Sequence, residues 1–165
     1  AELVSELQRL ADLLRLGSGV FNVETRVATD GCAYIMESSP RGGGNRLCEM
    51  LRLATGGATD LVRASVQAAL GLPVDELSMP AYDGFWFQQM LHSDHAGEFA
   101  GVEYAPGFRE AHVAEEQLWV APGARVEAFT AANHAFGSVM LRFGSRGELE
   151  AFRAAPGESM RAVVR

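Results

Sequence analysis

The sequence predicts an α+β protein, because helical and strand-like patterns alternate in its first half and strand-like runs dominate its second half. Residues 2–16 carry leucines at helical spacing. Two β-rich runs flank the Asp30-Gly31 pair, which is a strong hairpin signal. From about Tyr82 onward the apolar runs are short and strand-like. We therefore expect a helix–hairpin–helix–helix part followed by a mostly antiparallel β part.

The first expected helix covers residues 2–16. Its apolar positions share one face and are Leu3, Leu7, Leu10 and Leu14, with Leu13 alongside. Gly17 follows directly and is a natural stop for a helix.

Residues 20–29 and 32–38 form the expected hairpin around Asp30-Gly31. A two-residue turn pairs Thr29 with Cys32 and Val27 with Tyr34. The same register places Glu24 directly opposite Glu37. A three-residue loop would offset this pair.

Two more helices are expected after the hairpin. Residues 46–55 form the first, which Gly56-Gly57 closes. Residues 60–70 form the second, with Asp60 as its N-cap and Gly71 as its stop.

The second part of the chain contains five expected strands and one helix. The helix covers residues 146–155, after Ser145 as N-cap; the strands cover residues 85–91, 111–120, 124–129, 137–143 and 160–165. Pro73 and Pro80 indicate a connector between the two parts. We therefore expect domains at residues 1–78 and 79–165.

Composition excludes several classes of function. Hydrophobic residues make up 48% and charged residues 21%, as in ordinary soluble proteins. The net charge of −7 and the lack of a basic stripe exclude nucleic acid and an anionic membrane surface as partners. No apolar run is long enough to span a membrane, no secretory signal is visible, and the start at Ala1 indicates a cut chain.

Two further features of composition concern reactive side chains. All 14 basic residues are arginine, which excludes a lysine Schiff base and a Walker A phosphate loop. Cys32 and Cys48 lack zinc-site spacing, so we expect two buried thiols in a reducing, cytoplasmic setting.

The pair of Glu24 and Glu37 suggests a metal site. Directly opposed side chains in an antiparallel pair have Cβ atoms roughly 4.5–5.5 Å apart, where like charges repel. A shared proton or a divalent cation would relieve that repulsion, and carboxylate oxygens suit Mg²⁺ or Mn²⁺. The alternative is a solvated face on which Arg26 bridges the two acids.

The stretch after Glu37 adds groups that bind anions. Arg41 offers a bidentate fork for phosphate or carboxylate. Gly42, Gly43 and Gly44 would let the backbone approach a ligand closely. The alternative interpretation of the glycines is a flexible loop.

Together these residues resemble the metal-binding hairpin of ATP-grasp ligases. In that family an acid in one strand is followed, about a dozen residues on, by a second acid in E-x-N-P-R, and this chain carries E-S-S-P-R from Glu37. The stretch CEMLRLATGGATDLVRASVQAALGLP (48–73) is similar to the segment after that motif in biotin carboxylase, carbamoyl-phosphate synthase and amino-acid ligases. The resemblance covers residues 2–73, whereas 82–165 looks like the β-rich C-terminal subdomain of some members.

The resemblance implies a role for each matching residue. Glu24, Glu37 and Ser39 would be the metal ligands, Ser39 standing where the family has Asn. Arg41 would contact the transferred phosphate or the substrate carboxylate in catalysis. The cofactor-binding loop beside the acceptor site would consist of Gly42, Gly43, Gly44 and Asn45.

The resemblance also implies a reaction and a missing part. The parent enzyme would use ATP and Mg²⁺ (or Mn²⁺) to join a carboxylate to an amine through an acyl phosphate. The family's N-terminal lobe carries the phosphate-contacting lysines, which this chain lacks. We therefore expect the C-terminal part of such a ligase, inactive alone.

The alternatives are a non-catalytic binding or dimerisation module derived from this fold, and an unrelated α+β domain whose acids are simply exposed. A free sheet edge in the second part would allow a homodimer.

The remaining polar residues suggest weaker hypotheses. His92 and His95 form H-x-x-H, but partners for a zinc site are not evident. His112 is expected in a strand and His134 in a surface turn. Glu115 and Glu116 are expected to form a solvated pair.

Overall fold

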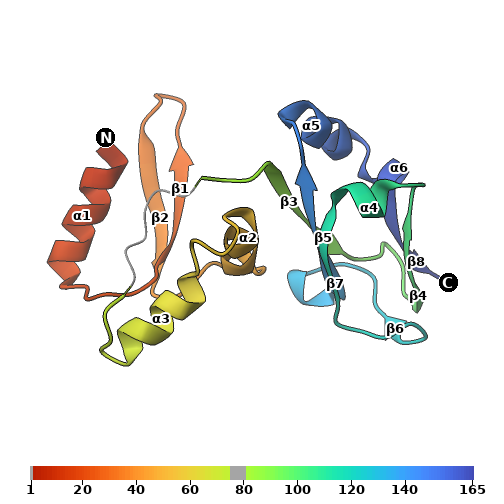
Figure 1. Cartoon of the computed structure of the whole chain (residues 1–165), viewed down its shortest axis with the longest axis horizontal. Coiled ribbons are helices and arrows are strands. Elements are labelled where there is room, and N and C mark those ends of the chain that lie inside the picture. Colours follow the sequence, from red (N-terminus) through yellow and green to blue (C-terminus); the bar gives the residue numbers. More distant parts are fainter. Residues whose placement is uncertain (1, 75–80) are drawn as a thin grey trace. The chain divides into compact units, whose positions relative to one another are not determined.

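The computed structural model describes residues 2–74 and 81–165. The chain divides into two compact units, residues 1–81 (unit 1) and 82–165 (unit 2), shown in Figure 1. The expected boundary between residues 78 and 79 lies outside the described residues.

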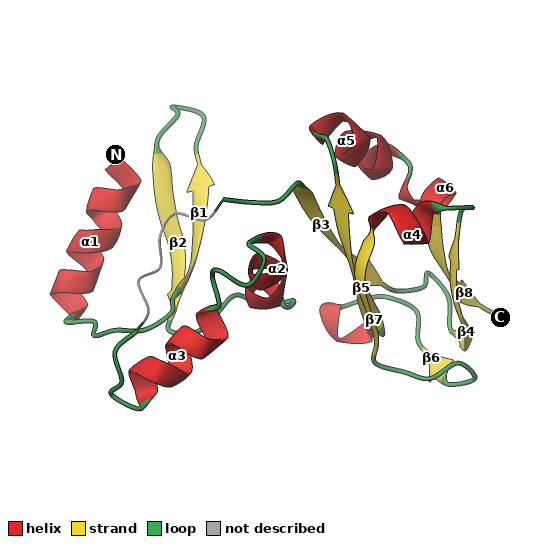
Figure 2. Cartoon of the chain, in the orientation of Figure 1, coloured by secondary structure: helices red, strands yellow, loops and turns green. Residues whose placement is uncertain are grey.

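Unit 1 contains three helices and a two-stranded antiparallel sheet among its described residues (Figure 2). They are α1 (Glu2–Leu14), β1 (Asn22–Val27), β2 (Ala33–Ser39), α2 (Leu47–Ala54) and α3 (Leu61–Ala69). The predicted order helix–hairpin–helix–helix is therefore confirmed.

Local signals set the ends of α3. The Asp60 side chain accepts a hydrogen bond from the Arg63 backbone N–H at 2.9 Å, which satisfies one of the N–H groups left open at a helix start. Gly71, just past the helix, has φ +67°, a left-handed conformation that favours glycine. Both ends lie where the sequence places them.

Unit 1 buries little apolar surface. Among its described residues the buried ones are small: Ala54, Thr59 and Ala64. The α3 residues Val62 and Val66 remain 60% and 53% exposed. The described residues of unit 1 therefore offer little core to hold the sheet in place, although an isolated hairpin is at best marginally stable in water.

Unit 2 contains two antiparallel three-stranded sheets, with strand orders β3-β7-β5 and β6-β4-β8. Their strands are β3 (Phe85–Leu91), β4 (Gly97–Tyr104), β5 (Val113–Leu118), β6 (Arg125–Val126), β7 (Gly137–Phe143) and β8 (Met160–Val164). The helical segments are α4 (Phe108–His112), the 3₁₀ turn η1 (Ala132–His134), α5 (Arg146–Ala154) and α6 (Pro156–Ser159). The predicted strands at 85–91 and 137–143 are confirmed to the residue.

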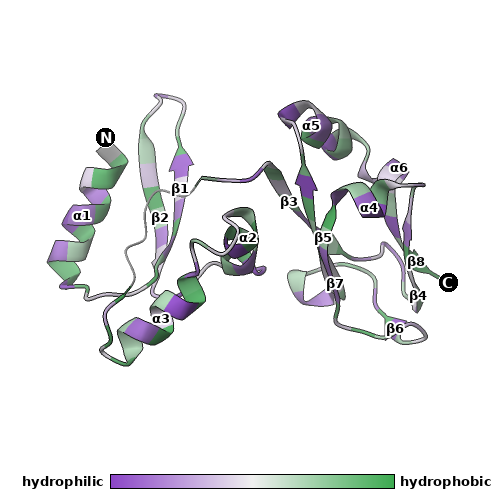
Figure 3. Cartoon of the chain, in the orientation of Figure 1, coloured by the Kyte–Doolittle hydropathy of each residue, from purple (hydrophilic) through white to green (hydrophobic). Residues whose placement is uncertain are grey.

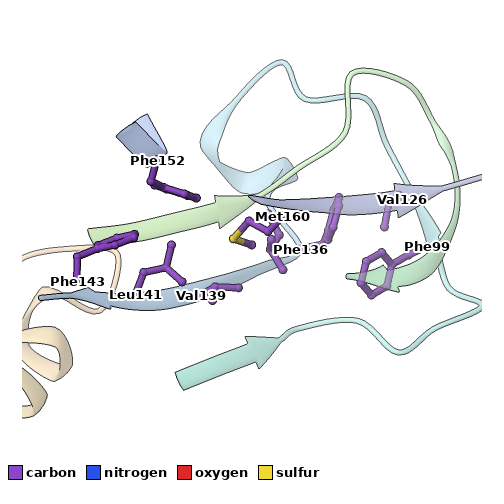
Figure 4. Packing of buried hydrophobic residues seen from close by; sticks show 9 residues of the cluster. Phe99, Val126, Phe136, Val139, Leu141, Phe143, Phe152 and Met160 are labelled. Atoms are coloured by element: carbon purple, nitrogen blue, oxygen red, sulfur yellow. The ribbon is translucent and has the colours of Figure 1, made fainter. Parts of the chain in front are cut away.

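The core of unit 2 is built from both sheets and α5, as Figure 4 shows. From β7, Val139 and Leu141 are fully buried, and Phe99 of β4 is fully buried as well. The Phe152 ring of α5 lies 5.4 Å from the Phe143 ring, centroid to centroid. Figure 3 shows hydrophilic and hydrophobic residues alternating along α5, as expected for a helix with one face on a core.

The structure corrects the prediction around residue 112. His112 was expected in a strand that begins at residue 111, but it is the last residue of α4. The Phe108 ring packs 5.7 Å from the Phe152 ring, so the chain turns through a short helix there before β5 begins. Strand β4 was not predicted, because its GEFAGVEY sequence interrupts the apolar alternation with glycine and alanine.

Glu116 is a second correction. It was expected to be half of a solvated pair, but its side chain is only 19% exposed. It accepts a short hydrogen bond from the Tyr104 hydroxyl and pairs with Arg109 at 3.4 Å. Burial raises the pKa of Tyr104 above its usual range, and the hydrogen bond to Glu116 adds to the rise.

Core packing predicts a contrast between two leucines. Leu141→Ala should destabilise unit 2 by about 2–5 kcal/mol, because it leaves a cavity among fully buried side chains. Leu13→Ala on α1, where the side chain is 70% exposed, should change stability by no more than about 0.5 kcal/mol. Urea unfolding followed by circular dichroism measures both, and equal losses would contradict this account of the core.

The raised pKa of Tyr104 predicts a loss of stability in alkali. Above about pH 10 the unfolded chain releases the phenol proton, whereas the folded chain retains it, so stability falls as pH rises. No lysine titrates in that range. Tyr104→Phe should flatten the fall between about pH 10 and 12, measured by urea unfolding.

Tyr82→Phe is the matched control, because the Tyr82 side chain is 61% exposed. It should keep the wild-type slope of stability against pH. A Tyr104→Phe slope equal to that of the wild type would rule out the linkage.

Candidate metal centre

The β1–β2 hairpin brings Glu24 and Glu37 together. In the register of the two strands, Glu24 pairs directly with Glu37. Nearer the turn the register shifts by one residue, and Thr25 pairs with Ile35. Met36 is thus the extra residue of a β-bulge, and the predicted pairing of the two acids is confirmed.

The turn itself differs from the prediction. The Ala28 N–H donates to the Cys32 carbonyl at 2.9 Å, which leaves Thr29, Asp30 and Gly31 as a three-residue loop. Gly31 has φ +82°, as the last residue of such a loop requires. The predicted pairing of Thr29 with Cys32 is therefore wrong.

The second predicted pair near the turn is also wrong. Val27 pairs with Ala33, and Tyr34 pairs with Arg26. The longer loop displaces the register by one residue, and the bulge at Met36 restores it. The pair of Glu24 and Glu37 survives because the two shifts cancel.

Both acids lie at the surface of the hairpin, and directly paired residues share one face of a sheet. The Ser39 hydroxyl donates a hydrogen bond to Glu37 Oε1 at 2.6 Å. Ser39 therefore sits beside the pair and orients one of its carboxylates.

Arg41 begins the loop between β2 and α2. Its backbone N–H donates to the Ser39 carbonyl at 2.8 Å, which turns the chain sharply after the strand. Its Nη1 donates to the Gly42 carbonyl at 2.9 Å. A guanidinium carries five N–H donors, so others are available to an anion.

Two of the three glycines pack closely against neighbouring side chains. A Cβ on Gly42 would collide with the Cys48 sulfur, and one on Gly43 would lie 2.6 Å from Leu47 Cδ1. At Gly44 nothing lies within 4 Å. Close packing against α2 therefore explains two of the three glycines, independently of any ligand. Asn45, with φ +52°, leads into α2.

Asn22 is a polar residue of this site that sequence reasoning missed. It pairs directly with Ser39, two positions from Glu24. The sequence signal for Asn22 is the pattern N-x-E, because alternate residues of a strand lie on the same face and Asn22 therefore shares a face with Glu24. Its amide oxygen lies 3.0 Å from where a Cβ on Gly43 would be.

The donor set fits a hard cation. Two carboxylates, a hydroxyl and an amide oxygen are all oxygen donors, which Mg²⁺ and Mn²⁺ prefer. In the part of the chain that the structure describes, no group of three or more His, Cys, Asp or Glu is arranged to hold a metal ion. A third protein ligand beside Glu24 and Glu37 would therefore be a neutral oxygen.

The histidines lie in other settings. The His92 ring packs 4.6 Å from the Phe129 ring, and His95 Nε2 lies 3.4 Å from the Val164 carbonyl. Both border a cavity of about 460 Å³ in unit 2. His134 lies in η1, where Thr130 N–H donates to its Nδ1.

Both cysteines are free and half-buried. No helix within the described ranges is long and apolar enough to cross a membrane.

No family model and no curated protein matches the sequence. Solved structures do match its fold. An L-amino acid ligase from Bacillus licheniformis matches 99% of this chain with a TM-score of 0.77 at 18% identity. A phosphoribosylglycinamide synthetase from Anaerococcus prevotii matches 98% with a TM-score of 0.66 at 13% identity. An N5-carboxyaminoimidazole ribonucleotide synthetase from Thermotoga maritima matches the whole chain with a TM-score of 0.63 at 15% identity.

The chain spans only 42%, 41% and 44% of the length of these three enzymes. All three are ATP-grasp enzymes, and the likeness extends over both units of the chain. The chain thus has an α+β fold like that of a part of these ATP-grasp enzymes.

Proposed function

We propose that this chain is the C-terminal part of an ATP- and Mg²⁺-dependent carboxylate–amine ligase, of the amino-acid type. The observation that carries the proposal is the direct pairing of Glu24 with Glu37 on a hairpin of ATP-grasp fold. The E-S-S-P-R sequence and the glycine loop come directly after that pair. A structural hairpin has no need of two like charges directly opposite each other.

Glu24 and Glu37 would hold Mg²⁺ or Mn²⁺, and Ser39, which donates a hydrogen bond to Glu37, would complete the site beside them. A bound cation would neutralise the negative charge of the ATP phosphates while the phosphoryl group is transferred. Arg41 would direct its remaining N–H donors at the transferred phosphoryl group or the substrate carboxylate. Gly42, Gly43, Gly44 and Asn45 would border the bound cosubstrate and the acceptor.

The proposed reaction has two steps. An oxygen of the substrate carboxylate attacks the γ-phosphorus of ATP, forming an acyl phosphate and releasing ADP. The amine then attacks the acyl carbon and loses a proton to solvent, so that a C–N bond forms, and phosphate leaves with the electrons of the broken C–O bond.

The sparse core in the described part of unit 1 is an argument that this unit contacts a further lobe of the proposed enzyme. Exposed apolar side chains on α3 and the hairpin, such as Val62, Val66 and Met36 (59% exposed), suit contact with further protein. We propose that the N-terminal lobe of the ATP-grasp family, which would carry the phosphate-contacting lysines, covers these side chains. This chain alone would then not turn over ATP, and the intact enzyme would act in the cytoplasm.

The proposal predicts metal binding that depends on Glu37. Isothermal titration of this chain with Mn²⁺ and with Mg²⁺ should detect weak binding, and Glu37→Gln should abolish it because one anionic ligand is lost. Glu110→Gln, which removes an exposed carboxylate on α4, should leave binding unchanged.

Two results would argue against the proposal. Wild-type protein that binds neither ion would favour a non-catalytic module in which the acids have lost their role. Equal loss in Glu37→Gln and Glu110→Gln would indicate diffuse attraction of cations to an acidic protein.

A further inference from the structure

Asn22 is the first residue of β1 and pairs with Ser39, next to the pair of Glu24 and Glu37. We propose that Asn22 is the neutral oxygen ligand of the divalent cation, and that Ser39 is a positioning residue for Glu37. This inference rests on the proposed function, because it assumes that a cation binds at Glu24 and Glu37.

The strand register places Asn22 beside the acids. Asn22 pairs with Ser39 and Glu24 pairs with Glu37, with no irregularity between these two pairs. Alternate residues of a strand point to the same face. The four side chains therefore occupy adjacent positions on one face of the hairpin, two from each strand.

The hydroxyl of Ser39 is already engaged. It donates to Glu37 Oε1 at 2.6 Å, a short charge-assisted hydrogen bond. Such a bond fixes the direction of the carboxylate, as partners of metal ligands commonly do. The E-x-N-P-R pattern has an Asn amide at the position of residue 39, but this chain has Ser there. Asn22, which pairs directly with Ser39, carries an amide oxygen instead.

Gly43 keeps space at the Asn22 amide. A Cβ at that position would lie 3.0 Å from Asn22 Oδ1 and 2.6 Å from Leu47 Cδ1. A side chain there would press on the amide and on the start of α2 together. The absence of a side chain at Gly43 therefore lets the Asn22 amide keep its present position beside the glycine loop.

The competing amide is that of Asn45. It lies in the loop that leads into α2, with φ +52°, whereas Asn22 is held in the hydrogen-bonded ladder beside Glu24. A ligand on a regular strand is placed more firmly than one on a loop. The geometry therefore favours Asn22.

The test is titration with Mn²⁺ alone, in which electron paramagnetic resonance measures the free ion. Asn22→Ala should raise the dissociation constant by more than the roughly 10- to 100-fold that loss of a ligand's hydrogen-bond partner typically costs, because a direct ligand is lost. Ser39→Ala should raise it less, because both carboxylates and the amide remain. Asn133→Ala removes the same amide from an exposed position in η1 and should change nothing. Circular dichroism confirms that each variant is folded.

A rescue variant makes the test specific. Asn22→Ala combined with Ser39→Asn moves the amide across the ladder and should bind Mn²⁺ more tightly than Asn22→Ala alone. The inference is overturned if Asn22→Ala binds like wild type, if Ser39→Ala loses as much as Asn22→Ala, or if the double variant gains nothing.

Failure of the underlying function has a different signature. A wild-type chain without Mn²⁺ binding, or binding that persists in Glu37→Gln, would refute the metal centre itself. Binding that requires Glu37 but not Asn22 would refute only the role given to Asn22.

Discussion

The register of the β1–β2 hairpin is the constraint on which the candidate metal centre depends. A one-residue slip would move every side chain of a strand to the opposite face. The three-residue loop introduces such an offset, and the bulge at Met36 removes it before Glu24 and Glu37 meet. Bulges that re-aim side chains are common beside functional sites.

Electrostatics explains why this hairpin tolerates its acids. Two unit charges about 5 Å apart repel by roughly 1 kcal/mol in water, and by several times more in a shielded site. Glu24 and Glu37 are exposed, so the repulsion stays small without a cation. Closing the site against water would raise the repulsion and, with it, the benefit of binding a cation.

Stability and proposed chemistry reside in different units. Unit 2 holds the large buried side chains, including three core phenylalanines of its sheets and α5: Phe99, Phe143 and Phe152. Unit 1 holds the candidate centre but buries only small residues within its described part. This division is one of the observations that support the proposed contact of unit 1 with a further lobe.

The sequence by itself determined the local elements. Leucine spacing, the Asp60 and Ser145 caps and the stop at Gly71 predicted helices that the structure confirms, because each signal acts through hydrogen bonds within a few residues. It also indicated which two acids pair across the hairpin. The strand β4 and the helix α4 escaped prediction, because Phe108 and the β4 residues take their conformation from contacts distant in sequence.

Only the tertiary structure decided the register. The predicted pairing of Glu24 with Glu37 was correct although the predicted turn was wrong, since the bulge cancelled an error of one residue. Neither the role of Ser39 as a donor to Glu37 nor the position of Asn22 across from it can be read from local pattern. Both depend on how two strands align, and alignment is set by the sum of turn, bulge and packing rather than by any single stretch of sequence.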